Sequence, residues 1–224
     1  MSIANFAAAL MSSNAVSARA IGIGLRCFWF GVLMILSTLV SAQPEATLAQ
    51  RIVDAARAQI GVTLSYDGSY RKLSYPNGDV PIETGVCTDV VIRALRRIDI
   101  DLQRAVHEDR RRHPERYPKR WRDASDRSID HRRVPNLQAW FAQHAQSFAA
   151  SADSSTFFPG DIVSWKLPGN LDHIGIVSDR YAGGRPLIIH NIGRGAEEAD
   201  VLFAWTISGH YRLRDATGDD IPAR

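Results

Sequence analysis

The spacing of apolar residues separates an N-terminal part with helical periodicity from a C-terminal part with strand-like runs. Apolar residues recur three and four positions apart in four segments, which predicts four helices. The predicted helices cover residues 47–60, a stretch that begins at 88, residues 102–112 and residues 134–148. Thr47 suits the N-cap of the first helix, and Gly61 suits its end. Glycine, proline and charged residues interrupt 62–86 and 113–133, which we therefore expect to be loops.

Short runs rich in β-branched and aromatic residues follow the helical part. They cover residues 161–165, 174–178, 187–189 and 201–205. Glycine, proline and asparagine separate the runs, and such short links favour antiparallel neighbours, because parallel strands need longer crossovers. Helices first and strands afterwards predict an α+β fold, with N-terminal helices packed on a small antiparallel sheet.

The first 42 residues have the character of an export signal. The apolar run from Cys27 to Val40 is shorter than the roughly 20 residues that a membrane helix needs, and Val40-Ser41-Ala42 supplies small residues for cleavage. We therefore expect a signal peptide over 1–42, a single domain over 43–224, and a location in the periplasm or cell envelope. The alternative is an N-terminal anchor that is not cleaved.

The charge balance gives little support to nucleic-acid binding. The chain has 27 Lys and Arg against 24 Asp and Glu, a net charge of +3, and Arg19 and Arg26 leave with the signal. We expect a monomer with no nucleic-acid partner and with membrane contact only through the signal segment. Basic residues concentrate in 104–133, which is typical of a solvated, salt-bridged face. The alternative is a surface that meets an anionic envelope polymer.

Cys87 is the cysteine that the mature chain keeps, because Cys27 lies within the signal. An unpaired thiol in an exported protein needs an explanation. Cys87 opens a helical pattern, and a helix N-terminus lowers the pKa of a thiol. His173 and His190 lie in later strand-like runs, as in a Cys/His nucleophile that folding assembles. The alternative is that Cys87 is a small buried apolar residue.

Each polar residue near these positions has a candidate role. His173 is the candidate base, and His190 orients it, with Asn191 as the alternative orienter. Asp89 either contacts substrate or caps the helix and pairs with Arg93. His107-Glu108 and His113 lack the spacing of a zinc protease, and no phosphate loop or dinucleotide fingerprint occurs. We therefore expect no metal and no cofactor.

Four motifs in this order resemble a known superfamily. They are Gly85-Val86-Cys87-Thr88-Asp89, Pro159-Gly160-Asp161-Ile162-Val163, Asp172-His173-Ile174-Gly175-Ile176-Val177 and Ile189-His190. The pattern, over residues 50–213, resembles the NlpC-type branch of the papain-like cysteine peptidases and amidases, which cut bacterial cell-wall peptides. It is most similar to a family of exported bacterial proteins of unassigned function placed in that superfamily.

The resemblance implies a papain-like fold with Cys87 as nucleophile, His173 as base and His190 as the third polar residue. It also implies an upstream aromatic hydroxyl that binds the oxyanion. Tyr66 is the candidate for that hydroxyl, and Tyr70 and Tyr75 are the alternatives.

The sequence departs from the family pattern at the expected substrate groove. Val86 replaces the usual acidic residue before the cysteine, Thr88-Asp89 replaces Ser-Gly after it, and the basic segment 101–133 is inserted. The expected function is an exported hydrolase that cleaves an amide bond in peptidoglycan peptides. The alternatives are a non-catalytic envelope-binding module on the same fold and a cysteine-dependent acyltransferase.

Overall fold

Helices come first along residues 46–121 and 125–214, the residues that this computed structural model describes. They are α2 (Leu48–Arg57), α3 (Cys87–Arg96), α4 (Leu102–Arg112) and α5 (Val134–His144). The helices expected over 47–60, from 88 and over 102–112 are confirmed. The hydroxyl of Thr47 accepts the N–H of Gln50, which caps α2 as the sequence predicts.

The expected signal peptide, residues 1–42, lies outside the described residues. None of the described helices has the length and apolar character needed to cross a membrane. From Ala46 onward the chain clusters as one compact unit.

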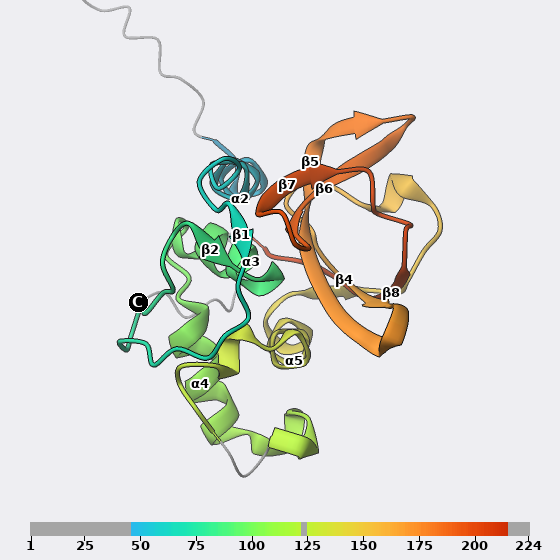
Figure 1. Cartoon of the computed structure of the whole chain (residues 1–224). Coiled ribbons are helices and arrows are strands. Elements are labelled where there is room, and N and C mark those ends of the chain that lie inside the picture. Colours follow the sequence, from blue (N-terminus) through green and yellow to red (C-terminus); the bar gives the residue numbers. More distant parts are fainter. Residues whose placement is uncertain (1–45, 122–124, 215–224) are drawn as a thin grey trace, which may run out of the picture. The chain divides into compact units, whose positions relative to one another are not determined.

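Six strands form one antiparallel sheet in the order β3-β8-β4-β5-β6-β7 (Figure 1). They are β3 (Gln146–Phe148), β4 (Ile162–Leu167), β5 (Leu171–Ala182), β6 (Arg185–Asn191), β7 (Ala196–Ala199) and β8 (Thr206–Arg212). Each neighbouring pair in this sheet runs antiparallel, as the short links between the runs predict. The fold is therefore α+β with an antiparallel sheet.

Two glycines set the turn between β5 and β6. Gly183 and Gly184 have φ of 54° and 79°. Both central residues of a type I′ hairpin turn need positive φ, which glycine adopts without a steric penalty. This tight turn places β6 directly beside β5 and so fixes the two strands that carry His173 and His190 as neighbours.

The connecting segments hold shorter elements. The strands β1 (Ser65–Tyr66) and β2 (Thr84–Gly85) form a small parallel pair before α3. The predicted loop 113–133 contains three single-turn 3₁₀-helices, and two more lie in the C-terminal half. These are η1 (Pro114–Arg116), η2 (Lys119–Trp121), η3 (Asp130–Arg132), η4 (Ser154–Thr156) and η5 (Pro168–Asn170).

Two element predictions are wrong. The run 201–205 is not a strand: Leu202 is fully buried, and its carbonyl accepts the indole N–H of Trp165 at 2.9 Å, so the run folds as a loop over the sheet. The helix expected to reach Phe148 ends at His144, because β3 instead pairs with β8. In both places the local pattern of side chains does not show the partner, which lies far away in the sequence: Trp165 for Leu202, and β8 for β3.

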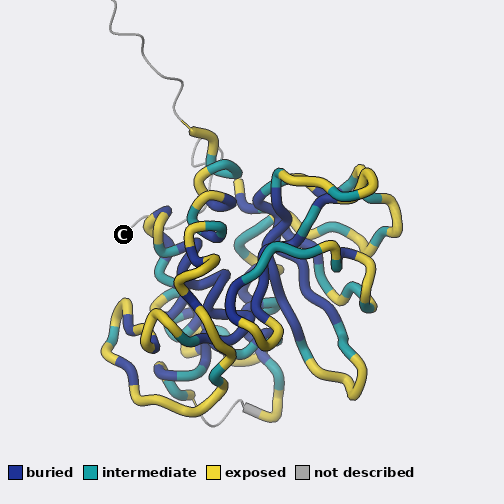
Figure 2. The backbone as a smooth tube through the Cα atoms, turned by 45° about the horizontal axis from the view of Figure 1, so that its top comes forward, coloured by how far each residue is buried: buried dark blue, intermediate teal, exposed yellow. Residues whose placement is uncertain are grey.

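The helices cover one face of the sheet and form the main core with it (Figures 1 and 2). Ile174 and Ile176 of β5 point into this core, as does Cys87 at the start of α3. The other face carries a smaller cluster around Trp165, Val177 and Leu202. Because side chains alternate along a strand, His173 follows its cross-strand partner Trp165 toward that second cluster.

The basic segment is not simply a solvated face. Arg110 is 2% exposed and bonds to the fully buried Asp130, and Arg132 is 7% exposed and pairs with Asp89. The main-chain turns of 125–133 therefore surround buried charge pairs and pack against α4 and α5. The expectation of a solvated, salt-bridged face is wrong for these two arginines.

Candidate active site

Cys87 occupies the first turn of α3, where backbone N–H groups lack partners within the helix. Its side chain is 4% exposed, and the backbone N–H of Ile174 on β5 is near enough to the sulfur to lower the pKa of the thiol. The register between β5 and β6 begins with Ile176 opposite Ile189, so in the described ladder Ile174 lies just beyond the paired part of β5. The thiol thus lies where β5 and β6 separate, beside the residue that follows His173.

His173 and His190 form a buried pair on these two strands. His173 Nε2 and His190 Nδ1 are 2.9 Å apart, and the two residues are 3% and 1% exposed. Gly175 makes room for this pair, because a Cβ there would lie 3.1 Å from the Cβ of His190 and 2.7 Å from Ile188. His190 thus contacts one ring nitrogen of His173, as an orienting residue would. The expected contact of the Cys87 thiol with the other nitrogen is not among the hydrogen bonds of the described residues.

Trp205 covers the two imidazoles. Its ring centroid lies 5.6 Å from that of His173 and 6.4 Å from that of His190, edge to face in both cases. An indole in this position limits the access of water to the bond between the histidines. Trp205 lies in the segment that the sequence assigned to a strand, so its role could not be predicted from the pattern alone.

Burial keeps the thiol and both imidazoles neutral in this state. It raises the pKa of Cys87 to about 12, an effect that the N–H of Ile174 only partly offsets. It also lowers the pKa of His173 to about 3 and that of His190 to about 4. The lowered thiol pKa expected from the helix N-terminus is not found, because removal from water outweighs the helix dipole here.

This raised pKa predicts how Cys87 reacts with iodoacetamide. Below about pH 12 each unit of pH should raise the thiolate fraction about tenfold, so the alkylation rate should keep rising from pH 7 to pH 10. The same chain unfolded in urea should level off near the free-thiol pKa of about 8.5. Alkylation followed by mass spectrometry measures both profiles. A plateau below pH 8 in the folded protein would contradict the neutral resting thiol.

Cys87 opens onto a cavity of about 270 Å³ that Tyr66 also lines. Burial raises the pKa of Tyr66 to about 12, so its hydroxyl keeps its proton. Tyr70 and Tyr75 bond instead to Asp126 and Glu108, and neither lines this cavity. Of the three candidate tyrosines, Tyr66 is therefore the one beside Cys87.

Asp89 and Asn191 hold the site together. Asp89 accepts the N–H of Val86 at 2.7 Å and pairs with Arg132 through two bonds of 3.0 and 2.9 Å. Arg93, its expected alternative partner, pairs with Asp79 instead. The amide of Asn191 donates to the carbonyls of Ser65 and Gly85, which ties the end of β6 to β1 and β2. The structure thus gives Asp89 the capping role and Asn191 a bracing role.

We predict that Arg132→Ala destabilises the fold by about 3–5 kcal/mol, because it leaves the carboxylate of Asp89 buried without its cation. The matched control is Arg71→Ala, which removes a half-exposed pair with Asp67 and should shift the unfolding midpoint far less. Urea unfolding followed by circular dichroism measures both. Equal midpoints for the two variants would show that the Asp89–Arg132 pair adds no stability.

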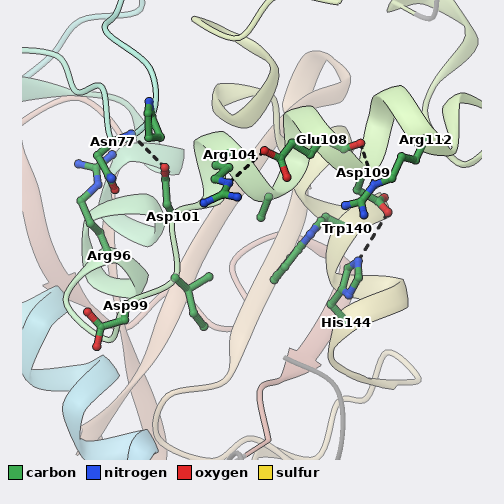
Figure 3. Close-up of a pocket in the computed structure, with 13 residues that line it drawn as sticks. Asn77, Arg96, Asp99, Asp101, Arg104, Glu108, Asp109, Arg112, Trp140 and His144 are labelled. Carbon is green, nitrogen blue, oxygen red and sulfur yellow. Dashed lines mark hydrogen bonds and ion pairs between the residues drawn. The ribbon is translucent and has the colours of Figure 1, made fainter. Parts of the chain in front are cut away.

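A larger cavity of about 580 Å³ lies between α4 and α5, away from Cys87 (Figure 3). Arg104 and Glu108 pair with each other on its rim, and His144 stacks on Trp140 at 4.6 Å. None of the expected catalytic residues lines it. Size alone therefore does not identify the candidate site, and the smaller cavity is the one that Cys87, the candidate nucleophile, lines. Within the described residues no cluster of three or more His, Cys, Asp and Glu is arranged to hold a metal ion.

Comparison with known proteins agrees with the extent of the domain. Residues 53–213 match the family described as "Domain of unknown function (DUF1287)". The chain belongs to this family. It is 54% identical over 177 residues to the "Uncharacterized protein YijF" of Escherichia coli (strain K12). The matched region covers 78% of this chain and 85% of that protein. No solved structure matches the chain.

Proposed function

We propose that this protein is an exported cysteine hydrolase of the NlpC-type, papain-like superfamily, and that it cleaves an amide bond in peptidoglycan peptides. The observation that carries the proposal is the 2.9 Å bond between His173 and His190 on β5 and β6, the strands against which α3 and its first residue Cys87 pack. A nucleophile at a helix N-terminus, a base and an orienting group are what amide cleavage through a covalent intermediate needs.

The bond between the histidines supports one choice of the acting nitrogen of His173. Nε2 of His173 is engaged by Nδ1 of His190, so in the proposed reaction Nδ1 of His173 takes the proton of the thiol. Among the described residues no hydrogen bond joins the side chains of Cys87 and His173 in this state, so the proposed transfer needs a side-chain rearrangement or a bridging water. For Nδ1 to take this proton, the N–H at Nε2 of His173 must donate the hydrogen bond to Nδ1 of His190. Nε2 of His190 then carries a proton and is buried with no hydrogen-bond partner in the described structure. His190 is thus the orienting residue, which selects the tautomer of His173.

The chemistry follows from these assignments. As the sulfur of Cys87 attacks the carbonyl carbon, its proton moves to Nδ1 of His173, so a neutral pair enters the reaction without forming a thiolate first. The hydroxyl of Tyr66 and the N–H groups at the start of α3 stabilise the oxyanion. The C–N bond then breaks, His173 gives the proton to the leaving amine, and a thioester remains. Water, deprotonated by His173, cleaves the thioester and returns the thiol.

The test is digestion of purified peptidoglycan by the mature chain, with mass analysis of the soluble products. New amine and carboxylate termini at one amide of the stem peptide are expected. Unchanged peptidoglycan after prolonged incubation, with the protein bound to it, would favour the alternative of a non-catalytic envelope-binding module.

That alternative is favoured by one observation, the buried and neutral thiol of Cys87. The acyltransferase alternative shares the thioester and differs only in the acceptor. Adding an amine acceptor such as glycinamide distinguishes the two enzymes, because a transferase forms the amide and a hydrolase releases the free acid.

A further inference from the structure

The cavity between α4 and α5 is separate from the candidate active site and takes no part in the proposed reaction. Its volume of about 580 Å³ lies within the roughly 300–1,000 Å³ of pockets that hold small ligands. Its lining follows α4 from the N-cap Asp101 to the last residue, Arg112. At 1.5 Å per residue these two positions are about 16 Å apart along the helix axis, so the cavity is elongated.

One end of the cavity is acidic. Asp99 and Asp101 lie at this end together with Arg96 (Figure 3). The guanidinium of Arg96 pairs at 2.9 Å with Asp79, which is not part of the lining. The side chain of Asp99 makes no hydrogen bond or ion pair within the described residues. The two carboxylates therefore set the sign of the potential at this end.

The backbone at Asp99 shows that stability is not the reason for a carboxylate here. Asp99 has φ of 68°. Its N–H bonds to the carbonyl of Arg96, and the next N–H, of Ile100, bonds to the carbonyl of Leu95, which is the pattern of a Schellman motif at the end of α3. Glycine is the usual residue at this position, because it adopts positive φ without steric cost. Stability alone would favour glycine, whereas aspartate adds a carboxylate to the wall of the cavity.

The other end of the cavity is basic. Asp109, Arg112 and His144 lie there (Figure 3). Asp109 is 4% exposed, accepts the hydroxyl of Tyr117 at 2.7 Å and lies 3.7 Å from Arg116, so its charge is offset within the fold. Arg112 donates through Nε to a main-chain carbonyl of its own helix, and no described carboxylate lies within salt-bridge distance of it. The guanidinium of Arg112 therefore sets the sign at this end.

His144 adds an unsatisfied polar group to the basic end. Its Nε2 is buried and has no hydrogen-bond partner among the described residues. The carboxylate of Asp109 lies 3.8 Å from this nitrogen, too far for a hydrogen bond. The imidazole stacks on Trp140 with ring centroids 4.6 Å apart, which holds it at the wall of the cavity. Buried polar atoms without a partner are uncommon, and a ligand that reached Nε2 would satisfy this one.

Between the two ends the wall suits a peptide backbone. Ile100, Ala105 and Trp140 give it an apolar side, and Arg104 and Glu108 pair at 3.0 Å on its rim. A peptide group donates through N–H and accepts through C=O, so it matches a carboxylate beside a guanidinium. An extended chain spans about 3.3–3.6 Å per residue, so about four or five residues cover the distance between the ends. A neutral sugar would match the rim as well but would leave the opposite charges of the two ends unused.

We propose that this cavity binds a short peptide with both termini free, its ammonium group at Asp99 and Asp101 and its carboxylate at Arg112 and His144. The site does not depend on the proposed function, because none of the candidate catalytic residues lines it. The need for a free ammonium group excludes stem peptides whose N-terminus is still held in an amide bond to the glycan. The ligand class is a released, zwitterionic oligopeptide.

Isothermal titration calorimetry with tetraalanine tests this proposal. The protein is the mature chain carrying Cys87→Ser, which cannot cut the probe by the proposed route. Tetraalanine is compared with N-acetyl-tetraalanine and tetraalanine amide, each of which lacks one terminal charge. The free peptide should bind, and each cap should weaken binding about tenfold, the size of a charge-assisted hydrogen bond.

Two variants assign the ends. Asp99→Asn should remove most of the difference between the free and the acetylated probe, and Arg112→Gln most of the difference between the free and the amidated probe. Asparagine tolerates positive φ, and Arg112 is exposed, so both variants should keep the fold. The matched control is Arg111→Gln, an exposed position in the same turn of α4 that does not line the cavity. It should keep the parent affinity for all three probes.

Several outcomes would overturn the proposal. One is no binding of tetraalanine at millimolar concentration, and another is equal affinity for the free and capped probes. An equal loss in Arg111→Gln and Arg112→Gln would indicate a general charge effect and would also reject the site.

Nuclear magnetic resonance locates the bound probe. The indole N–H resonance of Trp140, which lines this cavity, should shift on titration, whereas that of Trp205, beside the histidine pair, should not. A shift at Trp205 alone would place the probe at the candidate active site and overturn the proposal. Peptidoglycan digestion by the wild type is scored separately, so a failure of the hydrolase and a failure of the peptide site give different results.

Discussion

Cys87→Ser is expected to reduce the release of peptidoglycan fragments by roughly a thousandfold or more, because removing a nucleophile abolishes the covalent route and leaves only the binding contribution. Serine is close in size to cysteine, but its hydroxyl is a much weaker acid than a thiol, and the neutral His173 is a weak base in this buried site. The fold should be retained, since one small side chain changes at the edge of the main core. Fragment release from one peptidoglycan preparation, followed by mass spectrometry, measures the effect.

Thr88→Ser is the matched control, because Thr88 is the next residue of the same helix and is also buried. Its hydroxyl donates to the carbonyl of Arg132, a bond that serine can keep. This variant should release fragments at close to the wild-type rate. Equal release by wild type and Cys87→Ser would exclude the thioester mechanism.

Acidification is expected to unfold the domain through three buried histidines. Burial lowers the pKa of His131 and His173 to about 3 and that of His190 to about 4. In the unfolded chain each histidine titrates near 6.5. Because the unfolded state takes up protons first, the stability that these residues give is complete above pH 6.5 and is lost as pH falls toward 3 or 4. Each contributes about 1.4 kcal/mol per pH unit in that window.

At pH 4.5 the combined loss is of the order of 8 kcal/mol if the three sites act independently, which is comparable to the whole stability of many domains. Circular dichroism against pH measures the acid midpoint. His131→Gln should move the midpoint to lower pH, because it removes one buried titrating group outside the proposed site. His113→Gln is the control, since that side chain is 41% exposed, and it should leave the midpoint in place. A domain that stays folded at pH 3 would contradict this account.

The helices and the main strands could be predicted because their apolar spacing reflects a single buried face. The pattern around Leu48 to Arg57 and the runs in β4, β5 and β6 carry that signal directly. The loop 201–205 is a case in which apolar spacing does not predict the element. Leu202 is as apolar as a strand residue, but it lies over the second cluster with its carbonyl bound to Trp165. The sequence predicts that such a residue is buried, but it does not predict which group its main chain bonds to.

For the candidate site, the sequence identified the histidine pair but not the surroundings. Cys87, His173 and His190 could be chosen because their residue types and local patterns are informative. The direction in which the pKa of the thiol shifts could not be predicted, since it depends on how completely residues distant in sequence bury the sulfur. Arg132, which lines the cavity beside Cys87, was visible only as part of a charged segment. The inward position of Arg132 follows from its buried pair with Asp89, which links residues 43 positions apart.

The separation of β5 and β6 at Ile174 gives the protein a built-in spectroscopic reporter. In a continuous ladder the amide proton of Ile174 would meet a carbonyl of the neighbouring strand, whereas here it is near enough to the sulfur of Cys87 to lower the pKa of the thiol. Sulfur is the weaker acceptor, and its charge and size change when the thiol ionises or is acylated. The nitrogen-15 resonance of Ile174 and the exchange of its amide with deuterium should therefore follow the chemical state of Cys87 in solution, one residue at a time and without a substrate label.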